Sequence, residues 1–168
     1  DQSGLYMFDL TSSNAQVVHL NGHEGIVRDI EFAKNGDFYS IGLDNQILKW
    51  NSSSNSSEVF ASSEYQYTEI IVDPDGQYIS AADRSGNIMI YSVFDPEDPV
   101  IIAGSQNNAA VSMDFSNDGK FLVAGDKNYN IRLYTTDNWQ LTNTLRANKA
   151  KIMQVKFSPH SKYLASIG

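Results

Sequence analysis

The 168-residue sequence carries 12 basic and 20 acidic residues, a net charge of −8, and no cysteine. Its length and its 41% of hydrophobic residues suit one domain with a buried core, which argues against a disordered chain. Nucleic acids and anionic membranes need a basic face, and no cluster of lysine and arginine in the sequence supplies one. We therefore expect neither partner. The lack of cysteine excludes disulfides, thiolate nucleophiles and Cys-ligated metals.

The first predicted elements are two strands within residues 1–20, SGLYMFDL and QVVHL. A unit then recurs, made of an alternating apolar segment, a four-residue turn and a second apolar segment. It reads IVRDIEF-AKNG-DFYSIGL, YTEIIV-DPDG-QYISAA, AVSMDF-SNDG-KFLVAG and KIMQVKF-SPHS-KYLASIG. The first segments end at Phe32, Val72, Phe115 and Phe157, at spacings of 40, 43 and 42 residues. The Asn-Gly and Asp-Gly turns suit tight hairpins with positive φ, and the fourth turn has Ser161 in place of glycine.

A third strand follows each of the first three hairpins: QILKWN, NIMIYS and NIRLYT. Weaker fourth strands are expected near residues 58–60, 100–103 and 140–145, and the run NSSSNSSE (51–58) is expected to be a surface loop. No segment has an apolar period of 3.6 residues, so the sequence predicts an all-β protein with essentially no helix. Four strands in about 42 residues make one blade of a β-propeller.

The two ends of the sequence complement each other. Residues 1–20 supply third and fourth strands, and residues 147–168 supply first and second strands of a blade split between the termini. Whole four-stranded antiparallel blades are predicted for 21–61, 62–104 and 105–146, so that residues 1–168 hold four blades' worth of strand. The sequence starts without Met and stops within a blade, so we expect it to be part of a longer protein. No signal-like or membrane-spanning segment is present, which favours a cytoplasmic location.

One unit carries a further motif. Asn21-Gly22-His23 precedes the first strand, Ser40 and Asp44 lie in and after the second, and Trp50-Asn51 closes the third. This unit resembles the WD-repeat (WD40) β-propeller family, in which Gly-His opens a repeat and Trp-Asp closes its third strand. The resemblance implies a buried structural tetrad in which His23 bridges Asp44 and Ser40, with Trp50 as a donor at its end.

The other units keep the period of the family and lose its motif. No Gly-His pair precedes their first strands. The position of Trp50 is taken by Tyr91, Tyr134 and Phe8, and that of Asp44 by Ser85, Asn128 and Gln2. The sequence therefore resembles the family along its whole length, with one complete motif.

Candidate catalytic and metal-binding residues have plainer interpretations. His23 with Ser40 and Asp44 could suggest a catalytic triad, but the resemblance assigns them to the structural tetrad. His19 and His160 have no further ligand at a useful spacing. Paired carboxylates such as Asp73 and Asp75 bracket turns, where they bond backbone N–H groups. We predict no enzyme activity, no cofactor and no metal.

The resemblance implies that partner proteins or peptides dock on the face where each first strand begins. The residues expected there are Ile26, Arg28, Gln66, Thr68, Val111, Lys151 and Met153, with Ala109 beside them. Exposed arginine, methionine and aliphatic side chains are typical of a protein-binding surface. A protein-interaction scaffold is the function that we predict.

An alternative function is a propeller enzyme or a binder of calcium or a small ligand. It would use polar groups around the central channel, where the innermost strands offer Asp29, Glu69, Ser112 and Gln154.

The blades could form a closed ring in three ways. Two copies could form an eight-bladed homodimer, the sequence could belong to a longer propeller, or four blades could close on themselves.

Overall fold

The computed structural model describes residues 4–11, 16–104, 109–146 and 149–168. Within these residues it contains sixteen strands and no helix. The predicted all-β fold is therefore confirmed. Likewise, no described helix is long and apolar enough to cross a membrane.

Three four-stranded antiparallel sheets follow one another along the chain, each built from consecutive strands. The first contains β3 (Val27–Phe32), β4 (Phe38–Gly42), β5 (Gln46–Asn51) and β6 (Ser56–Ser62). The second contains β7 (Tyr67–Val72), β8 (Tyr78–Asp83), β9 (Ile88–Ser92) and β10 (Val100–Ile102). The third contains β11 (Ala110–Phe115), β12 (Phe121–Asp126), β13 (Ile131–Thr135) and β14 (Leu141–Leu145). Each sheet is a propeller blade, here called blades 1, 2 and 3.

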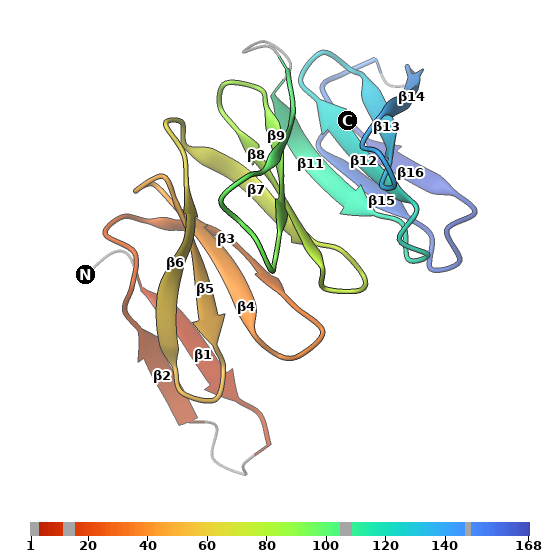
Figure 1. Ribbon diagram of the computed structural model, residues 1–168. Helices are drawn as coiled ribbons and strands as arrows, with labels where there is room; N and C mark the ends of the chain where they lie inside the picture. The colour runs from red at the N-terminus through yellow and green to blue at the C-terminus, as the bar shows by residue number, and fades with distance from the viewer. Residues whose placement is uncertain (1–3, 12–15, 105–108, 147–148) are drawn as a thin grey trace.

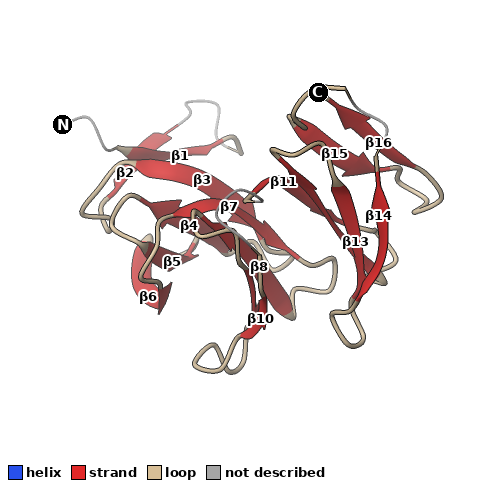
Figure 2. Cartoon of the chain, turned by 90° about the horizontal axis from the view of Figure 1, so that it is seen from above, coloured by secondary structure: helices blue, strands red, loops and turns tan. Residues whose placement is uncertain are grey.

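A two-stranded sheet stands at each end of this row. One pairs β1 (Leu5–Asp9) with β2 (Gln16–Leu20), and the other pairs β15 (Gln154–Phe157) with β16 (Leu164–Ile167). Figures 1 and 2 both show the two small sheets at opposite ends of the row. The sheets of the single chain are thus not closed into a ring, and the strands expected to share one blade do not pair with each other.

The turns follow their predicted chemistry, with one exception. Gly36, Gly76 and Gly119 have φ angles of +90°, +69° and +69°, and Ser161 adopts the same left-handed region at +55°. The exception is the loop predicted for residues 51–58. There β6 begins at Ser56, which pairs with Asn51, so only four residues separate the strands. Hydrogen bonds to the Asn51 carboxamide oxygen tighten this turn, which the low-complexity composition did not indicate.

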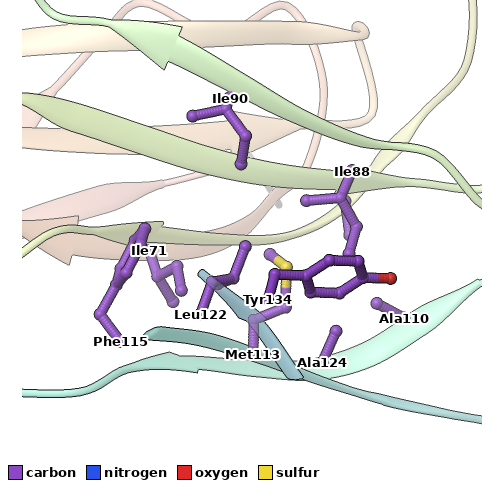
Figure 3. Packing of buried hydrophobic residues seen from close by; sticks show 10 residues of the cluster. Ile71, Ile88, Ile90, Ala110, Met113, Phe115, Leu122, Ala124 and Tyr134 are labelled. Atoms are coloured by element: carbon purple, nitrogen blue, oxygen red, sulfur yellow. The ribbon is translucent and has the colours of Figure 1, made fainter. Parts of the chain in front are cut away.

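The hydrophobic core lies between the blades. Figure 3 shows the cluster where blade 2 meets blade 3, with Ile71 and Ile88 facing Met113 and Leu122. A second cluster joins blades 1 and 2, and smaller ones join each two-stranded sheet to its neighbour. Blade packing therefore buries both faces of the middle strands, and all five residues of β4 are buried.

The first strands β3, β7, β11 and β15 lie next to one another along the inner edge of the row. Because strands alternate in direction, the starts of these first strands and the turns between second and third strands share one face, here called the top face. Backbone bonds confirm this arrangement, since Leu43 N–H donates to the Ile26 carbonyl and Arg84 N–H donates to that of Gln66, each at 3.0 Å.

Candidate functional site

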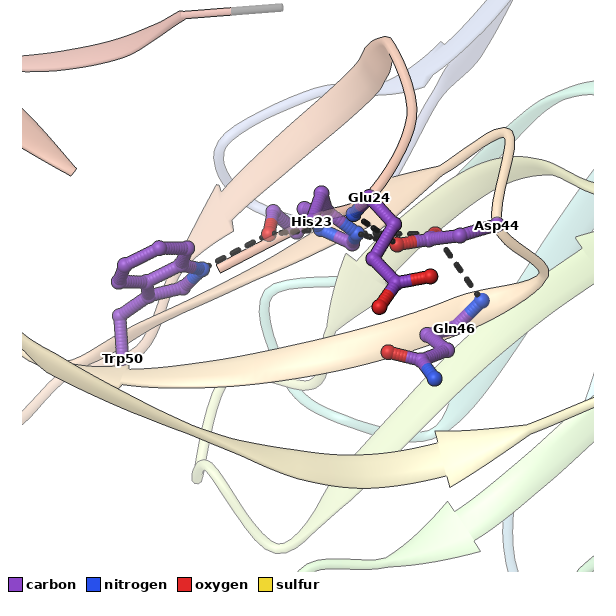
Figure 4. Close-up of polar contacts among 6 residues, drawn as sticks. His23, Glu24, Asp44, Gln46 and Trp50 are labelled. Atoms are coloured by element: carbon purple, nitrogen blue, oxygen red, sulfur yellow. Dashed lines mark hydrogen bonds and ion pairs between the residues drawn. The ribbon is translucent and has the colours of Figure 1, made fainter. Parts of the chain in front are cut away.

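The motif of blade 1 forms a continuous hydrogen-bonded chain (Figure 4). The Trp50 indole Nε1–H donates to Ser40 Oγ at 2.8 Å, and Ser40 Oγ lies 2.7 Å from His23 Nε2. His23 Nδ1 lies 3.0 and 2.9 Å from the two Asp44 carboxylate oxygens. Asp44 also accepts the backbone N–H of Glu24 at 2.9 Å, which ties the segment before β3 to the turn after β4.

The donors and acceptors of this chain fix one arrangement for a neutral histidine. An indole N–H only donates and a carboxylate only accepts, so Ser40 accepts from Trp50 and His23 Nδ1–H donates to Asp44. The Ser40 hydroxyl then donates to the free lone pair of His23 Nε2. Ser40 is fully buried and Trp50 is 1% exposed. The serine oxygen therefore bonds within the blade, and the arrangement joins β4, β5 and the turn between them to the segment before β3.

In blades 2 and 3 an aspartate at a different position stabilises the equivalent turn. Asp83 Oδ1 accepts the backbone N–H groups of Gly86 and Asn87, each at 3.0 Å. Asp126 Oδ1 accepts those of Asn128 at 2.8 Å and Asn130 at 3.0 Å. The positions of Ser85 and Asn128, which align with Asp44 in sequence, do not provide this carboxylate.

Strand register explains the change. Asp83 and Asp126 end their second strands at the position that Gly42 occupies in blade 1. A Cβ at Gly42 would lie 2.6 Å from both His23 Nδ1 and Asp44 Oδ1. A blade can thus hold either the histidine network with glycine or an aspartate at this position. Sequence reasoning missed the two aspartates because it searched for an acid at the position of Asp44.

The polar residues of the inner strands connect neighbouring blades. Asp29 Oδ2 accepts the Ile70 backbone N–H at 3.1 Å, and Ser112 Oγ accepts that of Val155 at 3.1 Å. At the equivalent place in blade 2, the Glu69 carboxylate bonds the backbone N–H of Met113. Each side chain reaches the strand of the next blade. Gln154 is exposed at the corresponding position of β15.

Glu69 is an unusual member of this series. Burial raises the pKa of Glu69 to about 7 from its ordinary 4.5, and the charges of Asp29 and Asp114 act in the same direction. The Met113 N–H and the Lys156 ammonium oppose the rise. The second carboxylate oxygen, Oε2, is buried without a hydrogen-bond partner among the described residues. The folded protein therefore favours the protonated acid.

This predicts a pH-dependent effect of Glu69→Gln on stability. The folded state keeps its proton up to about pH 7 while the unfolded chain loses it near pH 4.5, so stability falls as pH rises between these values and stays low above pH 7. We expect Glu69→Gln to match the parent at pH 4.5 and to be more stable at pH 8 by on the order of 1–2 kcal/mol. Urea unfolding at the two pH values measures the difference. The exposed control Glu64→Gln should show no such gain, and an equal gain for both variants would contradict the prediction.

The predicted partner face is spread across the top of the row. Ile26 and Met153 are 50% and 66% exposed, and Arg28 and Lys151 are also exposed. Gln66 is half-buried, and its carboxamide oxygen has no partner among the described residues. Ala109 is buried.

Arg28, Thr68 and Val111 come together around one pocket of about 430 Å³. Ala109 and Ala110 line it as well, and so do two cations that sequence reasoning missed, Arg84 and Lys127. Arg84 and Lys127 each directly follow the last residue of a second strand. This shared position is the one feature of the sequence that could have indicated that both lie on the top face. Lys151 and Met153 are not among the residues that line the pocket. A basic cluster that the linear sequence does not contain is thus assembled by three blades.

The described residues contain no group of three or more histidine, aspartate and glutamate side chains placed to hold a metal ion.

Four-stranded blades in series, with a His-Ser-Asp-Trp network in one of them, define a repeat protein of the β-propeller class. The family described as WD domain, G-beta repeat (WD40) matches residues 14–51, 105–135 and 139–168, more than half of the sequence. The chain belongs to the WD40 repeat family. WD40 repeats in general serve as protein-interaction scaffolds.

Two curated relatives are similar to the chain. Meiotic recombination protein rec14 of Schizosaccharomyces pombe is 26% identical over 133 residues, which cover 77% of this chain and 43% of the relative. Protein HIRA of Dictyostelium discoideum is 28% identical over 120 residues, which cover 58% of this chain and 11% of the relative. The chain therefore spans less than half the length of either relative.

Proposed function

We propose that this chain is a non-enzymatic scaffold that docks partner proteins or peptides on its top face. The main supporting observation is the pocket to which three blades contribute, on the same face as the exposed Ile26 and Met153. Exposed apolar side chains and cationic groups on one face of a protein are typical of a protein-binding surface. The turn networks of His23, Asp83 and Asp126 hold the backbone from which these side chains project.

Site-specific crosslinking tests the top face as the docking surface. A photoreactive residue at Ile26 or Met153 is expected to crosslink a partner protein. The control is the same residue at Phe94, which is 84% exposed and lies in the loop between third and fourth strands, on the opposite face. Partner adducts that form equally well from position 94, or only there, would refute docking on the top face.

The alternative, a ligand or calcium site at the channel, has weaker support. Asp29, Glu69 and Ser112 each accept a backbone N–H from the next blade, so their oxygens contribute to blade packing. A calcium-dependent rise in the melting temperature, lost in Asp29→Asn, would favour this alternative.

We further propose that two copies of the 168-residue chain complete one eight-bladed ring, in which β16 of each copy pairs with β1 of the other. The exposed aromatic residues Tyr6 and Phe8 on β1, at 52% and 56%, support such a contact. In complete blades Phe38 faces Trp50. By the same register, Leu164 of one copy would face Phe8 of the other.

Light scattering coupled to size exclusion measures the mass of the assembly. The proposal predicts a peak at twice the mass of one chain, and Phe8→Glu should convert it to the monomer. The matched control Phe94→Glu, also at an exposed aromatic residue, should leave the dimer intact. A monomeric parent protein, or a dimer insensitive to Phe8→Glu, would contradict this pairing.

A further inference from the structure

We propose that the pocket on the top face binds the anionic side chain of an acidic partner peptide, a carboxylate or a phosphorylated residue. This rests on the proposed function, because it names the chemistry of the docked partner. The pocket has a volume of about 430 Å³, which falls in the range of sites that hold small ligands or a few side-chain groups.

The cations of the pocket come from three blades. Arg28 projects from β3, Arg84 follows β8, and Lys127 follows β12. All three residues are exposed. Within the part of the chain that the structure describes, none of them forms an ion pair or a side-chain hydrogen bond. Their donors are therefore available to an incoming oxyanion.

The rest of the lining adds no negative charge. The other described residues around the pocket are Thr68, Ala109, Ala110 and Val111, so no carboxylate lies among them. The Thr68 hydroxyl donates to the backbone carbonyl oxygens of Ala82 and Ala110, at 3.3 and 3.4 Å. Binding of an anion thus falls to two guanidinium groups and one ammonium group. Guanidinium groups can bond both oxygens of a carboxylate or phosphate at once.

The charge of the whole protein favours a peptide over a nucleic acid. The sequence carries a net charge of −8, and a phosphate backbone requires a basic surface that extends over several phosphates. Three cations around one pocket instead match one or two anionic groups flanked by neutral chain. The small side chains of Ala109 and Ala110 leave room for that chain to approach the blades.

Fluorescence anisotropy with labelled peptides of equal length tests this proposal. The probes are a glutamate-containing peptide, its phosphoserine counterpart and its glutamine counterpart, with a single-stranded oligonucleotide as a fourth. We expect one or both anionic peptides to bind, the glutamine peptide to bind at least about tenfold more weakly, and affinity to fall with added salt. The ratio between the first two peptides distinguishes a carboxylate from a phosphate ligand.

Charge reversals locate the binding. Arg28→Glu and Arg84→Glu, on different blades, should each lower the affinity for the anionic peptide by about tenfold or more. Lys162→Glu is the matched control, since it changes the charge equally at an exposed site in the turn between β15 and β16. Circular dichroism verifies the fold of each variant.

The inference fails if the glutamine peptide binds equally well, if Lys162→Glu weakens binding as much as Arg84→Glu, or if the oligonucleotide binds more tightly than the peptides. Crosslinking from Ile26 and Met153 that survives Arg28→Glu and Arg84→Glu would retain the docking face and reject only the anionic pocket. If neither Ile26 nor Met153 gives a crosslink to a partner in a protein that keeps Arg28 and Arg84, the proposed function itself is rejected.

Discussion

Ser40→Ala is expected to lower the free energy of unfolding by about 2–4 kcal/mol, because it leaves two buried polar groups without partners. The Trp50 indole N–H would lose its acceptor, and His23 Nε2 would lose the hydroxyl 2.7 Å away. Alanine itself fits this place in a blade, since Ala81 and Ala124 occupy it in blades 2 and 3. The loss therefore reports the hydrogen bonds and not the shape of the side chain.

Urea unfolding followed by circular dichroism measures this effect. In a double-mutant cycle, Ser40→Ala should cost less in a Trp50→Phe background, where no indole N–H remains to be satisfied. Ser53→Ala, at an exposed serine of the turn between β5 and β6, should change stability by less than about 0.5 kcal/mol. Equal costs for Ser40→Ala in the two backgrounds would show that the serine and the indole are not coupled.

Asp126→Ala is expected to have the larger effect, about 3–5 kcal/mol. The carboxylate is fully buried and accepts the backbone N–H groups of Asn128 and Asn130 and the Asn130 side-chain amide. Its Oδ2 also lies 3.8 Å from Arg132 Nε, whose side chain is only 12% exposed. Alanine would therefore free several buried donors and remove the carboxylate that lies 3.8 Å from a mostly buried cation.

Asp126→Asn distinguishes the contribution of the negative charge to stability from that of the hydrogen bonds. Its carboxamide oxygen can still accept the two backbone N–H groups of the turn, so we expect a smaller loss than for alanine. Asp137→Ala, at an exposed loop position, should be nearly neutral in the same thermal or urea unfolding measurement. A loss for Asp126→Ala no greater than that for Asp137→Ala would show that the turn does not depend on the carboxylate.

The strand pattern of this chain is readable from the sequence because its signals are local. An apolar alternation, an Asn-Gly or Asp-Gly turn and a second apolar segment lie within about 20 residues, and the same order recurs at a period near 42. The described strands β3 to β5 accordingly fall where the first complete unit predicts them. The start of β6 at Ser56 was missed, since a serine-rich run lacks the β-branched and aromatic residues typical of strands, although Ser56 and Ser57 pair with Asn51 and Trp50.

The site was only partly predictable. His23, Ser40, Asp44 and Trp50 carry a motif whose spacing is visible in the sequence. Arg84 and Lys127 have no such motif, since they become neighbours of Arg28 only when three blades pack side by side. The proposed closure into a ring likewise has no local signal, because it would depend on which strand edges meet.

The side-chain bonds between inner strands give the row of blades a polarity. In the described bonds that join a side chain of one inner strand to the backbone of the next, the side chain belongs to the earlier strand, as where Asp29 accepts the N–H of Ile70. At the equivalent position of β15, the exposed Gln154 has a side-chain carboxamide oxygen that could accept such a bond from an added strand. At the other end, Ile30 N–H is already held by its own neighbour Asp29, at 2.9 Å. A strand that joined before β3 would compete with that internal bond for the Ile30 N–H, whereas one that joined after β15 would meet the exposed Gln154, so the two ends of the row differ chemically as sites for assembly.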